Sequence, residues 1–104
     1  MIKDRIIAWA EDRGILEKAT PQSQMLKTVE EVGELANAIA TKNQVEIVDA
    51  IGDIVVTLVI QAELNGLDFD ECVEVAYKVI SKRKGKMING MFVKEQINIK
   101  QKGL

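Results

Sequence analysis

The sequence predicts an all-α fold, a helical bundle of about four helices that ends in a short C-terminal β-hairpin. Apolar residues recur at three- or four-residue spacing through most of the chain, and typical helix-boundary residues separate the periodic segments. The 104 residues are 47% apolar and only 4% aromatic, which is enough for one largely aliphatic core. We therefore expect a single helical domain over residues 1–94 and a polar tail over residues 95–104.

The first two helices have clear boundaries in the sequence. One is expected over residues 2–13, where isoleucines and an alanine share a face and Gly14 ends the pattern. The next is expected over residues 21–41, because Thr20 followed by Pro21 is the usual order of a helix N-cap and a first helical residue.

The third predicted helix, over residues 45–64, is the most apolar part of the chain. Residues 54–60 are apolar on nearly every side and rich in β-branched side chains, so a buried strand is the alternative there. We favour a helix because the pattern outlasts a strand and ends at Asn65-Gly66, a usual C-terminal signal. A helix that is apolar all round must be covered on every side, by its own domain or by another subunit.

A fourth helix and a hairpin complete the expected fold. Asp68 and Glu71 have capping-box spacing ahead of a helix whose apolar face, including Cys72, is expected to point inward. Its end carries the cationic residues 82–86, which suit the negative end of a helix. Asn-Gly between two short apolar runs then predicts a hairpin over residues 87–93.

The composition excludes several classes of enzyme. The chain has no histidine and one cysteine, which rules out a Ser-His-Asp or Cys-His device, a His-ligated zinc ion and an intrachain disulfide. With 14 Lys+Arg against 16 Asp+Glu, the net charge of −2 gives no overall reason to bind nucleic acid or an acidic membrane. We find no signal-peptide or membrane-spanning stretch, and the lone cysteine fits a reducing cytoplasm.

Three glutamates crowd one side of the second predicted helix. At 100° per residue, Glu31 and Glu34 lie about 60° apart and Glu30 and Glu34 about 40° apart. Like charges at this spacing destabilise an isolated helix. Two explanations stay open, a well-solvated face or a bound cation. Lys27, four residues before Glu31, is expected to offset part of the repulsion.

A second acidic group, Glu46, Asp49 and Asp53, lies on the third predicted helix. Asp49 and Asp53 border the segment that should be buried, where an unpaired carboxylate is costly without a cationic partner, a raised pKa or a metal. If the second and third helices pack antiparallel through their short connection, the two acidic groups face each other. Carboxylates without nitrogen or sulfur ligands suit Mg²⁺ or Mn²⁺.

The order of these two motifs resembles a known family. Residues 30–35 (EEVGEL) followed by residues 49–53 (DAIGD) are similar to the MazG-like branch of the all-α nucleoside triphosphate pyrophosphohydrolases. The resemblance extends over residues 26–94. It implies a mostly helical bundle, assembled as a dimer or tetramer. It also implies Mg²⁺-dependent hydrolysis of a nucleoside triphosphate between the α and β phosphates.

The resemblance assigns roles to individual carboxylates. The first Glu-x-x-Glu motif of the family maps to Glu31 and Glu34, and its Glu-x-x-Asp motif maps to positions 50 and 53. Asp53 matches, but Ala50 stands where the family has an acid, with Asp49 one residue earlier. The implied metal ligands are Glu31, Glu34 and Asp53, with Asp49 as a substitute ligand. The alternatives at Ala50 are that the site binds one metal ion fewer than the family does, or that the enzyme is weakened.

Several residues outside these motifs can be interpreted either as functional or as structural. Glu30, a general-base candidate or a neighbour of the metal ligands, completes the predicted catalytic set with Glu31 and Glu34. The cationic run over residues 82–86 either holds the triphosphate or only closes a helix. Trp9 either stacks on a nucleobase or fills the core or an interface. The candidate substrate-binding residues are Lys27, Asn37, Lys82, Arg83, Lys86 and Trp9.

We therefore predict a cytoplasmic, Mg²⁺-dependent enzyme, with Mn²⁺ as a possible replacement, that converts nucleoside triphosphates to monophosphates and pyrophosphate. It is expected to self-associate as a dimer or tetramer and to have no membrane or specific nucleic-acid partner. The alternative is a non-catalytic nucleotide- or metal-binding helical oligomer in which the departure at Ala50 has reduced turnover. A third possibility is an interaction module whose acidic faces are merely solvated.

Overall fold

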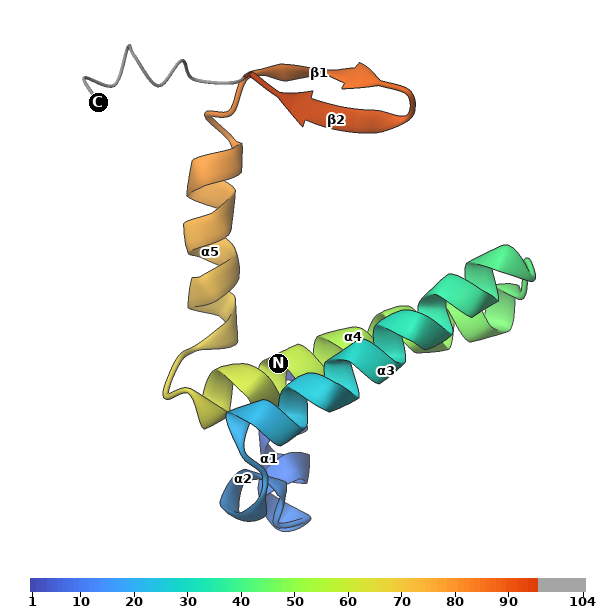
Figure 1. Cartoon of the computed structure of the whole chain (residues 1–104). Coiled ribbons are helices and arrows are strands. Elements are labelled where there is room, and N and C mark those ends of the chain that lie inside the picture. The colour runs from blue at the N-terminus through green and yellow to red at the C-terminus, as the bar shows by residue number, and fades with distance from the viewer. Residues whose placement is uncertain (96–104) are drawn as a thin grey trace. The chain divides into compact units, whose positions relative to one another are not determined.

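A computed structural model describes residues 1–95 of the chain, which form five helices and one hairpin. In chain order these are α1 (Ile2–Asp12), α2 (Ile15–Lys18), α3 (Pro21–Ala40), α4 (Gln44–Leu64), α5 (Phe69–Ile80), β1 (Gly85–Ile88) and β2 (Met91–Lys94) (Figure 1). The predicted all-α fold with a short C-terminal hairpin is confirmed, and α2 is a short addition to it. Of the predicted polar tail, residues 96–104 lie outside the described residues.

The chain divides into two compact units, Met1–Cys72 and the residues from Val73 onward. The first unit holds α1 to α4 and the start of α5, and the second holds the rest of α5 and the hairpin. Our expectation of a single domain over residues 1–94 stays a prediction, and the two units are described separately below.

Helices α3 and α4 form an antiparallel pair and are the main packing of the first unit (Figure 1). Thr20 caps α3 as predicted: its side chain accepts a hydrogen bond from the Ser23 amide, the Ser23 hydroxyl accepts one from the Thr20 amide, and Pro21 follows. Asn43 caps α4 by accepting a hydrogen bond from the Glu46 amide at 3.2 Å. The two caps set the first residue of each helix and so help to set the register of α4 along α3.

Buried hydrogen bonds connect α3 to the middle of α4. The Gln24 side-chain amide donates to the Thr57 carbonyl oxygen at 3.1 Å, and the Thr28 hydroxyl donates to the Thr57 hydroxyl at 3.0 Å. The Thr57 hydroxyl in turn donates to the carbonyl oxygen of Ile54 at 2.7 Å. All three polar side chains are buried and paired, so they hold α3 in one register on α4. The segment that could have been a strand is thus helical.

Small and aliphatic residues make up the core of the described chain, which α1 completes by packing against α4. The buried apolar residues are Ala10, Ala38, Ala50, Val59, Ile60 and Ala62. Large apolar side chains stay exposed on α3 and α4, for example Leu26 (71%), Val48 (65%) and Val45 (78%). Within the first unit, the apolar surface of α3 and α4 is therefore not fully covered, and self-association stays a prediction.

Two predictions concern the start of α5. The N-terminal cap is confirmed, because Asp68 accepts a hydrogen bond from the Glu71 amide at 3.0 Å. The prediction that Cys72 is a core residue is wrong, because Cys72 is exposed among the described residues. Among the described residues, no helix combines the length and the apolar character that crossing a membrane requires.

An ion-pair group connects α1 to the start of α5 within the first unit. The Lys3 ammonium pairs with Asp68 and lies 3.2 Å from a carboxylate oxygen of Asp70. Hydrogen bonding to the two carboxylates raises the pKa of Lys3, and hydrogen bonding to Lys3 lowers the pKa of Asp68. This contact holds α1 in place over α4, where it borders the site described below.

The hairpin of the second unit is confirmed and is slightly longer than predicted. Gly85 of β1 pairs with Lys94 of β2, and the turn residues Asn89 (φ 50°) and Gly90 (φ 79°) both have positive φ, as a type I′ turn requires. A Cβ atom on Gly85 would lie 2.3 Å from the carbonyl oxygen of Val93, so this position admits only glycine without a shift of the strands.

Candidate metal centre

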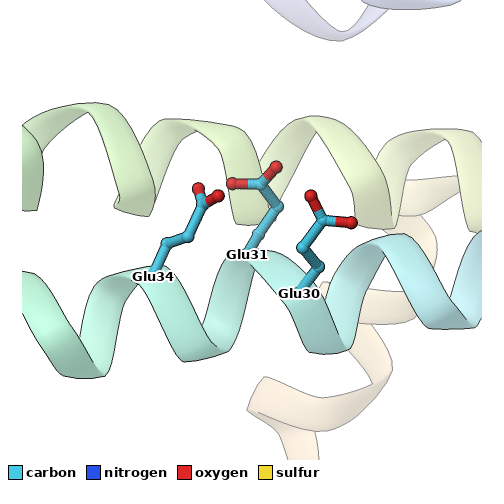
Figure 2. Close-up of side chains that lie close together, drawn as sticks. All are labelled: Glu30, Glu31 and Glu34. Atoms are coloured by element: carbon cyan, nitrogen blue, oxygen red, sulfur yellow. The ribbon is translucent and has the colours of Figure 1, made fainter.

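The carboxylates of Glu30, Glu31 and Glu34 form one group on α3. Each contributes an oxygen, and these oxygens all lie within 4.8 Å of one another. Figure 2 shows the three side chains extending from α3 toward the neighbouring helix α4. They share this direction because residues three and four positions apart lie on the same helix face. The structure thus brings together the three residues that the sequence predicts to be catalytic.

Glu31 is the least exposed member of this group. Its Oε2 atom is buried and, among the described residues, is without a hydrogen-bond partner. The pKa of Glu31 is raised by hydrogen bonding to Glu34, which is available only when one of the two carboxyl groups is protonated, then by burial, and by the negative charges of Glu34, Asp53 and Glu30. A buried acceptor with no partner is unfavourable, so this oxygen is poised for a cation or a donor.

The acidic residues of α4 lie next to this group. Burial raises the pKa of Asp53, and the charges of Asp49 and Glu34 raise it further. The charge of Asp53 in turn raises the pKa of Glu31. The carboxylates of α4 are therefore close enough to those of α3 to interact, which is the facing arrangement that the antiparallel pair predicts.

Lys27 pairs with Glu30, its Nζ atom lying 3.6 Å from Glu30 Oε2, and not with Glu31 as we expected. Both partners of this pair are more than half exposed, so it adds little stability. The difference has a simple cause: a lysine reaches residues three and four positions away equally well, and Glu31 turns toward α4 instead. The buried part of the acidic group therefore has no compensating side chain from Lys27.

The donor atoms of this centre fit a hard divalent cation. All of them are carboxylate oxygens, one of them buried and unpaired, and the sequence contains no histidine. Mg²⁺ and Mn²⁺ prefer such ligands, whereas zinc prefers nitrogen and sulfur. A cation here would also relieve the repulsion that raises the pKa of Glu31 and Asp53. Exposed acidic groups are common without metal, and the buried Glu31 oxygen is what distinguishes this one.

Ala50 occupies the position where the resemblance predicts an acid. It is 4% exposed on α4, whereas Asp49, one residue earlier, is exposed and interacts with Asp53. Among residues 1–95, the carboxylates close enough together to hold one ion are the three on α3, and Asp49 and Asp53 lie near that group without belonging to it.

The other predicted site residues lie on α1, on α3 and in the second unit. Asn37 is exposed on α3, one turn beyond Glu34, and Trp9 is 47% exposed on α1. Lys82, Arg83 and Lys86 belong to the second unit, where Lys86 lies on β1. Contact of these cationic residues with a substrate stays a prediction.

Sequence reasoning missed Arg5, which lines a pocket of about 440 Å³ together with Trp9 and Asp53. The signal was present in the sequence, because Arg5 and Trp9 are four residues apart and so share a face of α1. What the sequence did not show is that this face of α1 lies beside Asp53.

Comparison with known proteins identifies a family and one relative. The family model of the MazG nucleotide pyrophosphohydrolase domain matches residues 19–88. An uncharacterized 18.2 kDa protein in the rep-hol intergenic region of Haemophilus phage HP1 (strain HP1c1) is 47% identical over 60 residues. That match covers 58% of this chain and 37% of the phage protein, so the chain spans well under half of that relative. No solved structure gives a significant match.

The matched family segment contains all of α3 and α4 and therefore every carboxylate of the centre. It covers more than half of the chain, from the residue before the Thr20 cap to the end of β1. The chain belongs to the MazG nucleotide pyrophosphohydrolase family.

Proposed function

We propose that this protein hydrolyses nucleoside triphosphates between the α and β phosphates, in the presence of Mg²⁺ or Mn²⁺, and releases a monophosphate and pyrophosphate. Family membership supports a pyrophosphohydrolase-type hydrolase in general. The observation that carries the metal-dependent proposal is the buried, unpaired oxygen of Glu31 inside the group of three glutamate carboxylates on α3, with Asp53 of α4 close enough for its charge to raise the pKa of Glu31.

The proposed roles follow from exposure and charge. Glu31, Glu34 and Asp53 would hold the metal ion, and Asp49 would substitute for the acid missing at the next position. With a divalent ion held there, the phosphate charge would be neutralised and the pKa of the attacking water lowered. Glu30, exposed at the edge of the group and oriented by Lys27, is the carboxylate that accepts the proton of that water.

We also propose that the protein acts in the cytoplasm as a dimer or tetramer. The exposed apolar side chains on α3 and α4 support self-association, since a monomer in water would leave them uncovered. Lys82, Arg83 and Lys86 are proposed to contact the triphosphate, because cations at this density attract a polyanion. Sedimentation or light scattering measures the assembly.

A non-catalytic nucleotide- or metal-binding protein is the second candidate, and Ala50 is the observation that favours it. A methyl group at this buried position supplies no ligand, so turnover depends on Asp49. Asp49→Asn tests whether turnover depends on Asp49. A large loss of turnover shows that Asp49 serves as a ligand, and an unchanged rate shows that the centre functions with one acid fewer.

The direct test is pyrophosphate release from each of several nucleoside triphosphates with Mg²⁺, repeated with Glu34→Gln. The matched control is Glu46→Gln, which makes the same change at an exposed position in the first turn of α4. Release that disappears only in Glu34→Gln supports the enzyme. Nucleotide or Mg²⁺ binding without release supports the second candidate, and the absence of both overturns the centre.

A further inference from the structure

The pocket beside Asp53 combines residues from two helices of the first unit. It has a volume of about 440 Å³, which lies in the range of about 300–1,000 Å³ typical of small-molecule sites. Four of its residues come from α1 and two from α4. They are Ile2, Arg5, Ile6, Trp9, Asp53 and Val56.

The α1 side of this pocket is one helix face. Its four residues are spaced i, i+3, i+4 and i+7, so they follow one another along a single stripe. The stripe contributes two aliphatic side chains, one aromatic ring and one guanidinium group, that of Arg5. Trp9 is 47% exposed, so part of its ring is free to meet a ligand. Arg13, whose guanidinium lies 5.8 Å from the centroid of this ring, does not line the pocket.

We infer that this pocket receives the nucleobase of the nucleotide whose phosphates reach the carboxylate centre, an inference that rests on the proposed function. Asp53 lines the pocket, and its charge reaches Glu31 of the acidic group, so the pocket lies next to that group. The flat base stacks on Trp9 while the aliphatic residues exclude water around it. A base in this pocket therefore places the phosphates next to the carboxylates of α3 and α4.

Arg5 gives this pocket a chemical preference. A guanidinium group only donates hydrogen bonds, so it pairs with a carbonyl oxygen and not with an exocyclic amino group. The ligand class is thus a nucleobase with a carbonyl oxygen on its outer edge. Inosine and adenosine form a matched pair of probes, because they differ at the base edge in a carbonyl oxygen against an amino group.

Trp9 is the only tryptophan of the chain, so its fluorescence reports on this pocket alone. We would titrate the uncharged nucleosides inosine and adenosine into the protein with EDTA present, so that neither metal nor phosphate contributes. Inosine should quench the fluorescence saturably and bind more tightly than adenosine. Arg5→Gln should weaken inosine binding about tenfold, the effect of one hydrogen bond to a charged group. Arg13→Gln, the matched control beside the same ring, should keep the wild-type affinity.

The outcomes separate this inference from the proposed function. Absence of saturable quenching by either nucleoside overturns the nucleobase pocket, even in a protein that releases pyrophosphate. Equal affinity for the two nucleosides, or a folded Arg5→Gln variant with wild-type affinity, overturns the role of Arg5. Saturable inosine binding in a protein that releases no pyrophosphate upholds the pocket and overturns the proposed hydrolysis.

Discussion

Glu31→Gln should stabilise the metal-free protein and remove its stabilisation by Mg²⁺. At pH 8 the Glu31 carboxylate meets the negative charges of Glu34, Asp53 and Glu30, and its Oε2 atom is buried without a partner. The glutamine side chain has the same shape and no charge, and its amide donates a hydrogen bond that a carboxylate lacks. We therefore expect a substitution that removes the proposed activity to raise the free energy of unfolding of the metal-free protein.

The magnitude follows from the three repulsive neighbours. Glu34, three residues from Glu31 on α3, forms a like-charge pair that costs a few tenths of a kcal/mol, and the charges of Asp53 on α4 and of the adjacent Glu30 add to it, so the total is about 1 kcal/mol. For a domain of this size that gain raises the melting temperature by about 4–8 °C. Mg²⁺ at 100 times its dissociation constant should stabilise the wild type by about 2.7 kcal/mol and the variant by much less. The order of stability of the two proteins should therefore invert between EDTA and Mg²⁺.

The assay is thermal unfolding followed by circular dichroism at pH 8, in EDTA and in a series of Mg²⁺ concentrations. Glu46→Gln is the control, because Glu46 is exposed in the first turn of α4, where a negative charge suits the helix N-terminus. It should lower the melting temperature slightly and keep the full Mg²⁺ shift. A Glu31→Gln variant that melts at or below the wild type in EDTA refutes the repulsion. A Mg²⁺ shift that persists in it refutes Glu31 as a ligand.

Further predictions concern pH, the buried hydroxyls and the hairpin. Because the folded-state pKa values of Glu31 and Asp53 are raised, the folded protein keeps protons that the unfolded chain has released. The free energy of unfolding in EDTA should then fall as pH rises above the ordinary carboxyl values of 4.5 and 3.8, as denaturation at several pH values would detect. Thr57→Val should lower the free energy of unfolding by about 1–3 kcal/mol, because it leaves buried hydrogen-bonding groups unpaired. The same change at the exposed Thr41 should cost less than about 0.5 kcal/mol in the same urea titration. Gly85→Ala should abolish the cross-strand contacts seen by NMR, because its Cβ atom would lie 2.3 Å from a backbone oxygen of β2.

Local signals in the sequence were sufficient to predict most of the fold. The order Thr20-Pro21 and the dipeptide Asn89-Gly90 each act through backbone geometry within a few residues, so their consequences do not depend on the rest of the molecule. The exposure of Cys72 was not predictable in this way. An apolar face on α5 requires a cover, but helical periodicity does not say whether that cover comes from the same chain.

The acidic centre was predictable for a related reason. Helical spacing places Glu31 and Glu34 on one face, and a connection of only three residues, 41–43, forces α4 back along α3 and so brings Asp53 opposite them. The partner of Lys27 was not predictable, since it depends on which way each long side chain turns. The pocket with Arg5 depends on how α1 crosses α4, a contact between segments about 50 residues apart in sequence that no local pattern specifies.

The departure at Ala50 has a physical interpretation once the burial of each position is known. A glutamate there would add another charge to a buried position beside Asp53, whose pKa is already raised by burial and by its neighbours. Asp49 provides a carboxylate that interacts with the same Asp53 from an exposed position, where its own hydration is retained. Asp49 and Asp53 therefore stand as neighbouring acids on α4 while a methyl group fills the buried position between them. The methyl group spares the metal-free protein a further buried charge beside Asp53.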